Sequence, residues 1–176
     1  MGTDVIQMIK YAKQAVGLAL AALALLACAG CAGGDDGGPD LDPAEMARAM
    51  MDADTTLPQM VERSSGDADG EDSFTYLSSL DYGKVDSYFY ACADAGTAEE
   101  IAVVKLKDKR DAAALMESLH DHIKARQGTF AEYDPEQLPL TEDAVVTREG
   151  RYVTLIVSKK SGLVQQEFQK FFQQDE

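Results

Sequence analysis

The hydrophobic pattern begins with a continuous apolar run, Ala15 to Ala27, that follows two lysines, Lys10 and Lys13. The run is 13 residues long, whereas a membrane-spanning helix needs about 20. A positive segment, a short apolar core and small residues after it are typical of a secretory signal peptide. We therefore predict a signal peptide over residues 1–27 and favour it over the alternative, an uncleaved anchor helix.

A second, longer pattern alternates between the periodicities of strands and helices. The predicted order is strand, strand, helix over residues 85–93, 100–106 and 108–130, then a hairpin over 144–158 and a helix from Ser161. These are two ββα units in series. They predict an α+β fold with two layers, in which a four-stranded, mainly antiparallel sheet carries helices on one face.

The segment before these units changes from linker to helix. Residues 32–43 are mostly Gly, Asp and Pro, which have little to bury, so we expect a flexible tether. Asp42 is a good helix N-cap and Pro43 suits the first turn. Methionines at helical spacing follow; they favour core packing over a binding groove. The predicted organisation is a signal peptide over 1–27, a lipidated cysteine and tether over 28–41, and one α+β domain over 42–176.

Two of the three cysteines, Cys28 and Cys31, follow the apolar run directly. The segment "LLAC", Leu25–Cys28, resembles the lipobox of bacterial lipoproteins, in which the cysteine after the cleavage site is diacylated on its sulfur. The resemblance implies lipidation of Cys28. Cys31 is the second choice, because Cys28 stands where the lipobox has an aliphatic residue. Two or three acyl chains on one cysteine anchor a protein stably to a membrane.

The charge of the chain limits its partners. Aspartate and glutamate number 31 against 16 lysines and arginines, which gives a net charge of −15. So acidic a surface repels phosphate backbones, and we predict no nucleic-acid partner. It also repels anionic lipid headgroups. Contact with the membrane is therefore expected through the lipid anchor and not through a basic face.

An acidic segment over residues 64–74 is a candidate for a metal site. Asp67, Asp69 and Asp72 alternate there with glycines that permit sharp turns. Such carboxylates suit Ca²⁺, which takes six or more oxygen ligands. A solvated acidic turn, in which Asp72 caps a short helix, explains the segment equally well. We predict no other metal site and no cofactor.

Few other residues suggest catalysis. His120 and His122 lie two apart on the predicted helix and point in roughly opposite directions, so they cannot share a metal ion. Cys92 is interpreted as a buried, inert thiol, because a nucleophile needs a nearby base and both histidines belong to another element. Glu99 and Glu100 would suit a catalytic cleft, but are more typical of a turn beside a strand. We assign no catalytic residue.

Aromatic residues offer a possible binding surface. Tyr88 and Tyr90 alternate with Phe89 along a predicted strand, so aromatic rings point to both faces of the sheet. On an uncovered face they would suit a peptide or glycan; packing against the helices is as good an interpretation. We name Tyr88, Tyr90 and Tyr133 as possible binding residues.

Three pieces of sequence carry a resemblance to a known family. They are Ala98–Val103 ("AEEIAV"), Phe130 with Tyr133, Asp134 and Pro135, and Gly150 followed by Tyr152 and Val153. Together they resemble domain-of-unknown-function family 4358 of bacterial lipoproteins, over about residues 45–172. The resemblance implies a lipobox-bearing protein of a Gram-positive bacterium related to clostridia. The family has no established activity, so it supplies no catalytic residue.

These observations lead to a functional expectation. We expect a lipoprotein anchored to the outer face of the cytoplasmic membrane, with a non-catalytic binding or adaptor role towards an envelope protein, peptide or glycan. The alternatives are a cell-envelope hydrolase and a receptor for a small ligand or metal. An enzyme requires a cleft that holds Cys92, a histidine or paired carboxylates.

Overall fold

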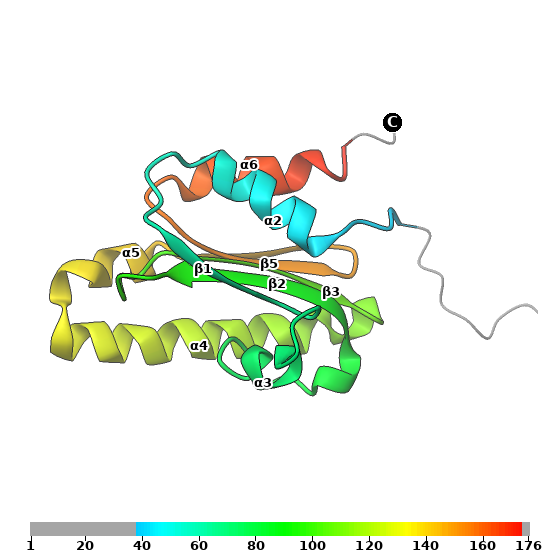
Figure 1. Ribbon diagram of the computed structural model, residues 1–176, viewed down its shortest axis with the longest axis horizontal. Coiled ribbons are helices and arrows are strands. Elements are labelled where there is room, and N and C mark those ends of the chain that lie inside the picture. Colours follow the sequence, from blue (N-terminus) through cyan, green and yellow to red (C-terminus); the bar gives the residue numbers. More distant parts are fainter. Residues whose placement is uncertain (1–37, 174–176) are drawn as a thin grey trace, which may run out of the picture. The chain divides into compact units, whose positions relative to one another are not determined.

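The computed structural model describes residues 38–173 and shows a five-stranded antiparallel sheet in the middle of the domain (Figure 1). The strands are β1 (Met60–Ser64), β2 (Val85–Ala93), β3 (Glu100–Leu106), β4 (Val145–Glu149) and β5 (Tyr152–Val157). Their order across the sheet is β1-β2-β3-β5-β4, and every neighbouring pair is antiparallel. The predicted signal peptide, Cys28, Cys31 and most of the predicted tether lie outside the described residues.

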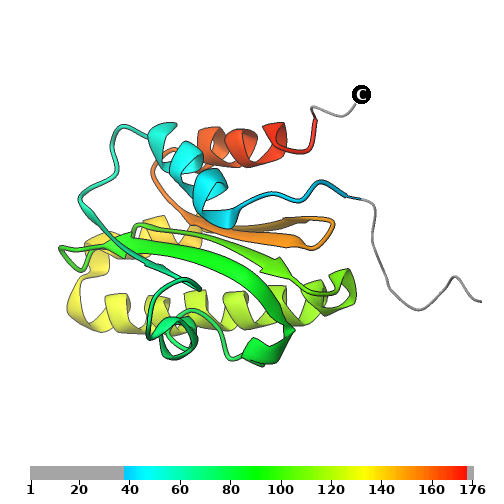
Figure 2. The same ribbon diagram turned by 45° about the vertical axis from the view of Figure 1, so that its right-hand side comes forward.

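Helices cover both faces of the sheet (Figures 1 and 2). On one face lie the long α4 (Ala112–Tyr133) and the short α3 (Gly70–Phe74), with α5 (Leu138–Glu142) packed against α4. On the other face lie α2 (Pro43–Asp52) and α6 (Ser161–Lys170). Single 3₁₀ turns, η1 (Tyr82–Lys84), η2 (Lys109–Asp111) and η3 (Pro135–Gln137), join some of these elements. In the part of the chain that the structure describes, no helix is long and apolar enough to cross a bilayer.

The predicted fold class is confirmed, but the predicted numbers of strands and layers are wrong. The units β2-β3-α4 and β4-β5-α6 occur in the expected order. The sequence does not predict β1, because two of its five residues are charged, and pairing with the edge of β2 makes it a strand. Because helices cover both faces of the sheet, β3 is buried along its whole length. A strand buried on both faces has a nearly continuous apolar sequence.

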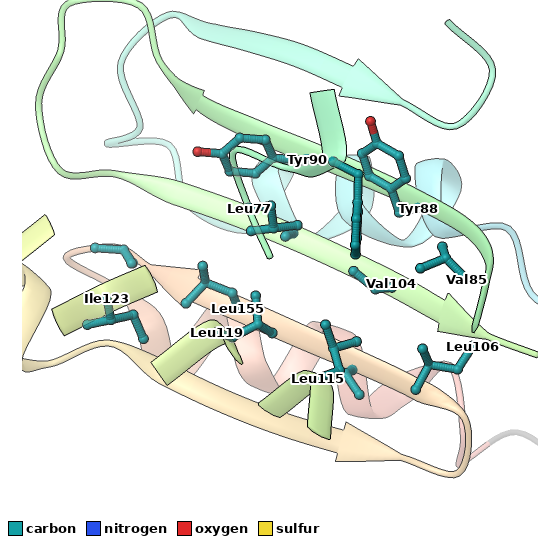
Figure 3. Close-up of a cluster of buried hydrophobic side chains, with 14 of the residues drawn as sticks. Leu77, Val85, Tyr88, Tyr90, Val104, Leu106, Leu115, Leu119, Ile123 and Leu155 are labelled. Atoms are coloured by element: carbon teal, nitrogen blue, oxygen red, sulfur yellow. The ribbon is translucent and has the colours of Figure 1, made fainter. Parts of the chain in front are cut away.

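The core on the α4 side forms as the helical spacing predicts. Leu115, Leu119 and Ile123 project from α4 onto the sheet, where they meet Val104 and Leu155 (Figure 3). All five side chains are at most 8% exposed. This contact fixes which face of α4 is turned towards the sheet, and therefore which of its polar residues approach β2 and β3.

The core on the opposite face uses the methionine stripe. Met46 and Met50 of α2 are fully buried with Phe168 of α6 and Ile101 of β3, so the prediction of core packing is confirmed. Helix α2 starts as predicted, since the side chain of Asp42 accepts a hydrogen bond from the backbone N–H of Ala44 at 2.9 Å.

Two glycines are expected to respond to alanine in opposite ways. A Cβ on Gly70 would lie 2.7 Å from the backbone oxygen of Ser64, so Gly70→Ala should lower the free energy of unfolding by about 2 kcal/mol. Gly128 lies inside α4 with nothing within 4 Å of an added Cβ, so Gly128→Ala should raise it by about 1 kcal/mol. Urea unfolding followed by circular dichroism measures both. Equal effects of the two substitutions would contradict this packing.

Asp54 makes the stability of the domain sensitive to acid. Burial opposes its ionisation, but hydrogen bonds from Ser158 and Thr56 and the charge of Lys160 outweigh it and hold the pKa of Asp54 below its usual 3.8. A carboxyl group whose pKa is lower in the folded state stabilises the fold above its unfolded-state pKa, and that contribution disappears as the pH falls through the folded-state value.

The expected result is a loss of stability below about pH 4 that is smaller in Asp54→Asn than in the wild type. Unfolding free energies measured from pH 6 to pH 2 test this. The control is Asp52→Asn, at the exposed end of α2, which should keep the wild-type slope. Parallel curves for wild type and Asp54→Asn would show that Asp54 has no such role.

Candidate functional site

A buried carboxylate marks the most unusual chemistry in the described part of the chain. Glu100, the first residue of β3, has a fully buried side chain that faces α4. It contacts Nε2 of His122 at 2.8 Å, Nε of Arg126 at 2.9 Å and the hydroxyl of Tyr90 at 3.1 Å. A buried charge is tolerated only when it is paired and hydrogen-bonded. These three partners supply that compensation.

Regular secondary structure positions Glu100 and its three partners, and it places Cys92 beside them. Cys92 pairs with Glu100 across β2 and β3, and Tyr90 lies two residues before Cys92, so all three side chains share one face of the sheet. His122 and Arg126 are four residues apart on α4 and therefore lie on one face of the helix. The apolar contact between α4 and the sheet turns that face towards Glu100.

A hollow of about 240 Å³ opens beside this cluster. It lies between β1, β2, α4 and the segment after α3, and its lining residues are Arg63, Tyr76, Tyr90, Cys92, His122 and Arg126. A second hollow of about 190 Å³ has Tyr76 and His122 in its lining as well. It extends along α4 past Ser118 and Asp121. We call the two adjoining hollows the α4 groove.

Hydrogen bonds to the Ser118 hydroxyl connect the two walls of the α4 groove, which are α4 and the segment after α3. Ser118 of α4 accepts hydrogen bonds from the hydroxyl of Ser78 at 2.8 Å and from the backbone N–H of Ser79 at 2.9 Å. These bonds hold the segment after α3 against the helix. Tyr76 belongs to the same segment and is 70% exposed. A large aromatic ring is thus kept in solvent at the point shared by both hollows.

Two polar residues of the groove, Arg126 and Tyr90, are held by contacts within the protein. Arg126 is fixed by Glu100, by the backbone oxygen of Thr97 at 3.1 Å and by the ring of Phe130, 4.9 Å from the guanidinium carbon. Burial and the adjacent Glu100 carboxylate raise the pKa of Tyr90 above its usual value, so Tyr90 remains a neutral hydrogen-bond donor.

His122 and Arg63 retain unused bonding capacity. With Nε2 of His122 held by Glu100, its Nδ1 makes no hydrogen bond to any described residue. Arg63 is half-buried and donates to Sγ of Cys92 at 3.4 Å. Within the described range it forms no ion pair, unlike Arg126. The groove can therefore offer a ligand an imidazole nitrogen and a guanidinium group.

Residues 62–158 match the family described as Domain of unknown function (DUF4358). This span covers just over half of the chain. The chain belongs to the DUF4358 family. No curated protein and no solved structure matches it. Every residue in the lining of the α4 groove lies inside the DUF4358 span, whereas α2 and α6 lie outside it.

Tyr88 and Tyr90 pack against helices in the structure, which is one of the two interpretations that the sequence leaves open. Tyr88 and Tyr90 are only 1% and 4% exposed, because α3 and α4 cover the face to which they point. The hydroxyl of Tyr88 donates to the backbone oxygen of Gly70 at 2.7 Å. Tyr90 contributes to the groove lining from below. Tyr133, at the end of α4, is 82% exposed and does not line the groove.

The acidic candidates for calcium do not come together. Asp67 accepts hydrogen bonds from the backbone and hydroxyl of Ser64, while Asp69 accepts one from the hydroxyl of Ser73. Over residues 38–173 no three acidic, histidine or cysteine side chains form a group that could hold a metal ion. Asp72 lies within α3, and the capping position belongs to Asp69.

Of the two histidines, only His122 lies in the α4 groove, and Cys92 lies there with it. His120 and His122 face different hollows, as the geometry of a helix predicts. The interpretation of Cys92 as a buried thiol needs correction, because Cys92 is half-buried. It lines the same hollow as His122. The pattern contained a partial indication of this site, since His122 and Arg126 form a polar pair four residues apart. Only the fold shows that this pair faces Glu100.

Proposed function

We propose that this DUF4358 protein is a lipid-anchored, extracytoplasmic binding domain whose ligand occupies the α4 groove. One observation carries the proposal: the groove combines an exposed aromatic ring, Tyr76, with two polar groups, His122 and Arg63, that retain unused bonding capacity. Pockets that bind small ligands usually pair apolar walls with a few polar groups that fix orientation. An exposed aromatic ring and polar groups without full hydrogen bonding are not needed to stabilise a core.

The anchor is supported by the sequence at the start of the chain. The "LLAC" segment after a signal-peptide-like run favours acylation of Cys28, and the net charge of −15 disfavours direct adsorption to anionic lipid. The protein would then lie on the outer face of the cytoplasmic membrane of a Gram-positive-type bacterium. Its partner would be an envelope protein, a peptide or a glycan.

A thermal-shift screen of the full chain against amino acids, short peptides, sugars and small acids tests groove binding. A ligand at about 100 times its Kd stabilises the folded state by about 2.7 kcal/mol, which raises Tm by several degrees. We expect hits with the wild type that disappear in Arg63→Gln/Tyr76→Ala. His120→Gln, whose side chain faces another hollow, should keep them. Hits that persist in the double variant would refute binding in the groove.

A thiol-dependent cell-envelope hydrolase is the second candidate, because Cys92 and His122 line one hollow and Glu100 holds the imidazole. In that reaction Sγ attacks an acyl carbon, Nδ1 passes the thiol proton to the leaving group, and water then hydrolyses the thioester. In the described structure the sulfur is hydrogen-bonded to Arg63 and not to the imidazole, which favours binding over hydrolysis.

A panel of p-nitrophenyl esters tests the hydrolase. Turnover by the wild type that Cys92→Ala abolishes would establish hydrolysis. Equal rates for the two proteins, or no turnover above buffer, would contradict it.

A further inference from the structure

We infer that the α4 groove recognises a single free carboxylate, held by Arg63, on a ligand of the size of an amino acid or a peptide end. This inference rests on the proposed function and specifies its ligand class. It starts from Arg63, which projects from β1 into the hollow beside Cys92.

The guanidinium of Arg63 has more donors than partners. Its single hydrogen bond within the described residues goes to the sulfur of Cys92, and a thiol is a weak acceptor. A guanidinium carries five N–H donors in a planar fork. Most of that fork is therefore available to a ligand, in a chain where acidic residues outnumber basic ones 31 to 16.

Nearby carboxylates do not occupy this fork. Asp67 is directed to the backbone and hydroxyl of Ser64, and Asp69 to the hydroxyl of Ser73. Glu62, the neighbour of Arg63 on β1, pairs with Arg48 at 3.3 Å. Side chains of adjacent strand residues point to opposite faces of the sheet, so Glu62 belongs to the other face.

The charge balance of the first hollow selects a monoanion. Two arginines line the first hollow, and Glu100 offsets the charge of Arg126. Arg63 then leaves one net positive charge. A carboxylate balances it and matches the guanidinium fork in a bidentate pair. A phosphate dianion would instead leave an excess negative charge beside the buried Glu100.

The rest of the groove indicates what accompanies the carboxylate. The first hollow, about 240 Å³, holds one small residue, and the exposed Tyr76 ring lies beside it. The adjoining hollow of about 190 Å³ is lined by serine hydroxyls and by Asp121. That hollow suits a neutral or positively charged group. The ligand is therefore expected to place its carboxylate at Arg63 and its polar, non-anionic part towards Asp121.

The two histidines provide a direct test. The imidazole C2–H protons of the full chain in detergent give two NMR resonances, because His120 and His122 are its only histidines; His120→Gln assigns them. Four probes are titrated: N-acetyl-Ala-Ala with a free carboxylate, the same peptide as its amide, propionate, and inorganic phosphate. We expect the free-acid peptide to shift the His122 resonance and leave His120 in place, and the amide to bind at least tenfold more weakly.

Variants separate recognition from folding. Arg63→Gln should weaken the binding of the free-acid peptide at least tenfold. Arg48 is an exposed arginine of α2, and Arg48→Gln should leave the affinity for that peptide unchanged. Equal Tm values confirm that both variants fold. Propionate that binds as tightly as the peptide would identify a free small acid as the source of the carboxylate.

Other results overturn the inference. Equal binding of acid and amide, tighter binding of phosphate, or no shift of His122 with any probe would show that the groove does not select a carboxylate. Hits in the thermal-shift screen that depend on the groove would still support groove binding in each of these cases.

Discussion

Glu100→Gln is expected to lower the free energy of unfolding by about 3 kcal/mol, because removing one partner of a buried ion pair leaves the others uncompensated. Glutamine preserves the shape of the side chain but removes the charge that holds Arg126 and His122. Arg126 retains its contact with the carbonyl of Thr97, which limits the loss. Urea unfolding of wild type and variant, followed by circular dichroism, measures the difference.

The neighbouring glutamate provides a matched control. Glu99 is also buried, with 6% of its side chain exposed, but its ion-pair contact is with the mostly exposed Lys159 at 3.6 Å. Its Oε2 accepts no hydrogen bond from the described residues, and solvent screens its pair with the exposed lysine, so Glu99→Gln should change the unfolding free energy by less than about 1 kcal/mol. Similar losses in the two variants would mean that burial alone, and not the cluster with His122 and Arg126, makes Glu100 important.

Cys28→Ala is expected to move the protein from the membrane fraction to the soluble fraction. Each acyl methylene contributes about 0.8 kcal/mol to membrane insertion, so the loss of two or three chains removes the attachment almost entirely. Cell fractionation with an antibody to the folded domain measures the distribution. Cys31→Ala is the control and should remain with the membrane.

Two outcomes would contradict this prediction. Retention of Cys28→Ala with release of Cys31→Ala would show that the second cysteine carries the lipid. Retention of both variants and of the double variant would show that the apolar run at residues 15–27 itself anchors the protein.

Much of the fold can be predicted from local patterns. Leu115, Leu119 and Ile123 repeat at helical spacing because α4 buries one face, and Met46 and Met50 do the same for α2. Strand β1 could not be predicted, because Glu62 and Arg63 interrupt its apolar pattern and the strand depends on pairing with β2. The second helical layer could have been predicted from β3. Its residues from Ile101 onwards alternate between two faces of the sheet, and both faces are buried.

The candidate site depends on contacts between distant residues. Glu100 resembles a turn residue in the sequence, and only its contact with His122 of α4, 22 residues further along, reveals it as a buried charge. Cys92 resembles an ordinary core residue until Arg63 of β1 and His122 of α4 are placed around it. Local sequence patterns give the orientation of each side chain on its own element, but the pairing of the elements decides which side chains meet.

Native mass spectrometry of the full-length protein, extracted from its own membranes in mild detergent, tests the central claim most directly. We predict a diacylglyceryl group on an N-terminal Cys28, together with a non-covalent small-molecule adduct. Arg63→Gln/Tyr76→Ala should lose that adduct and His120→Gln should keep it. An unmodified N-terminus, or an adduct that persists equally in the groove variant, would contradict a lipid-anchored domain that binds its ligand in the α4 groove.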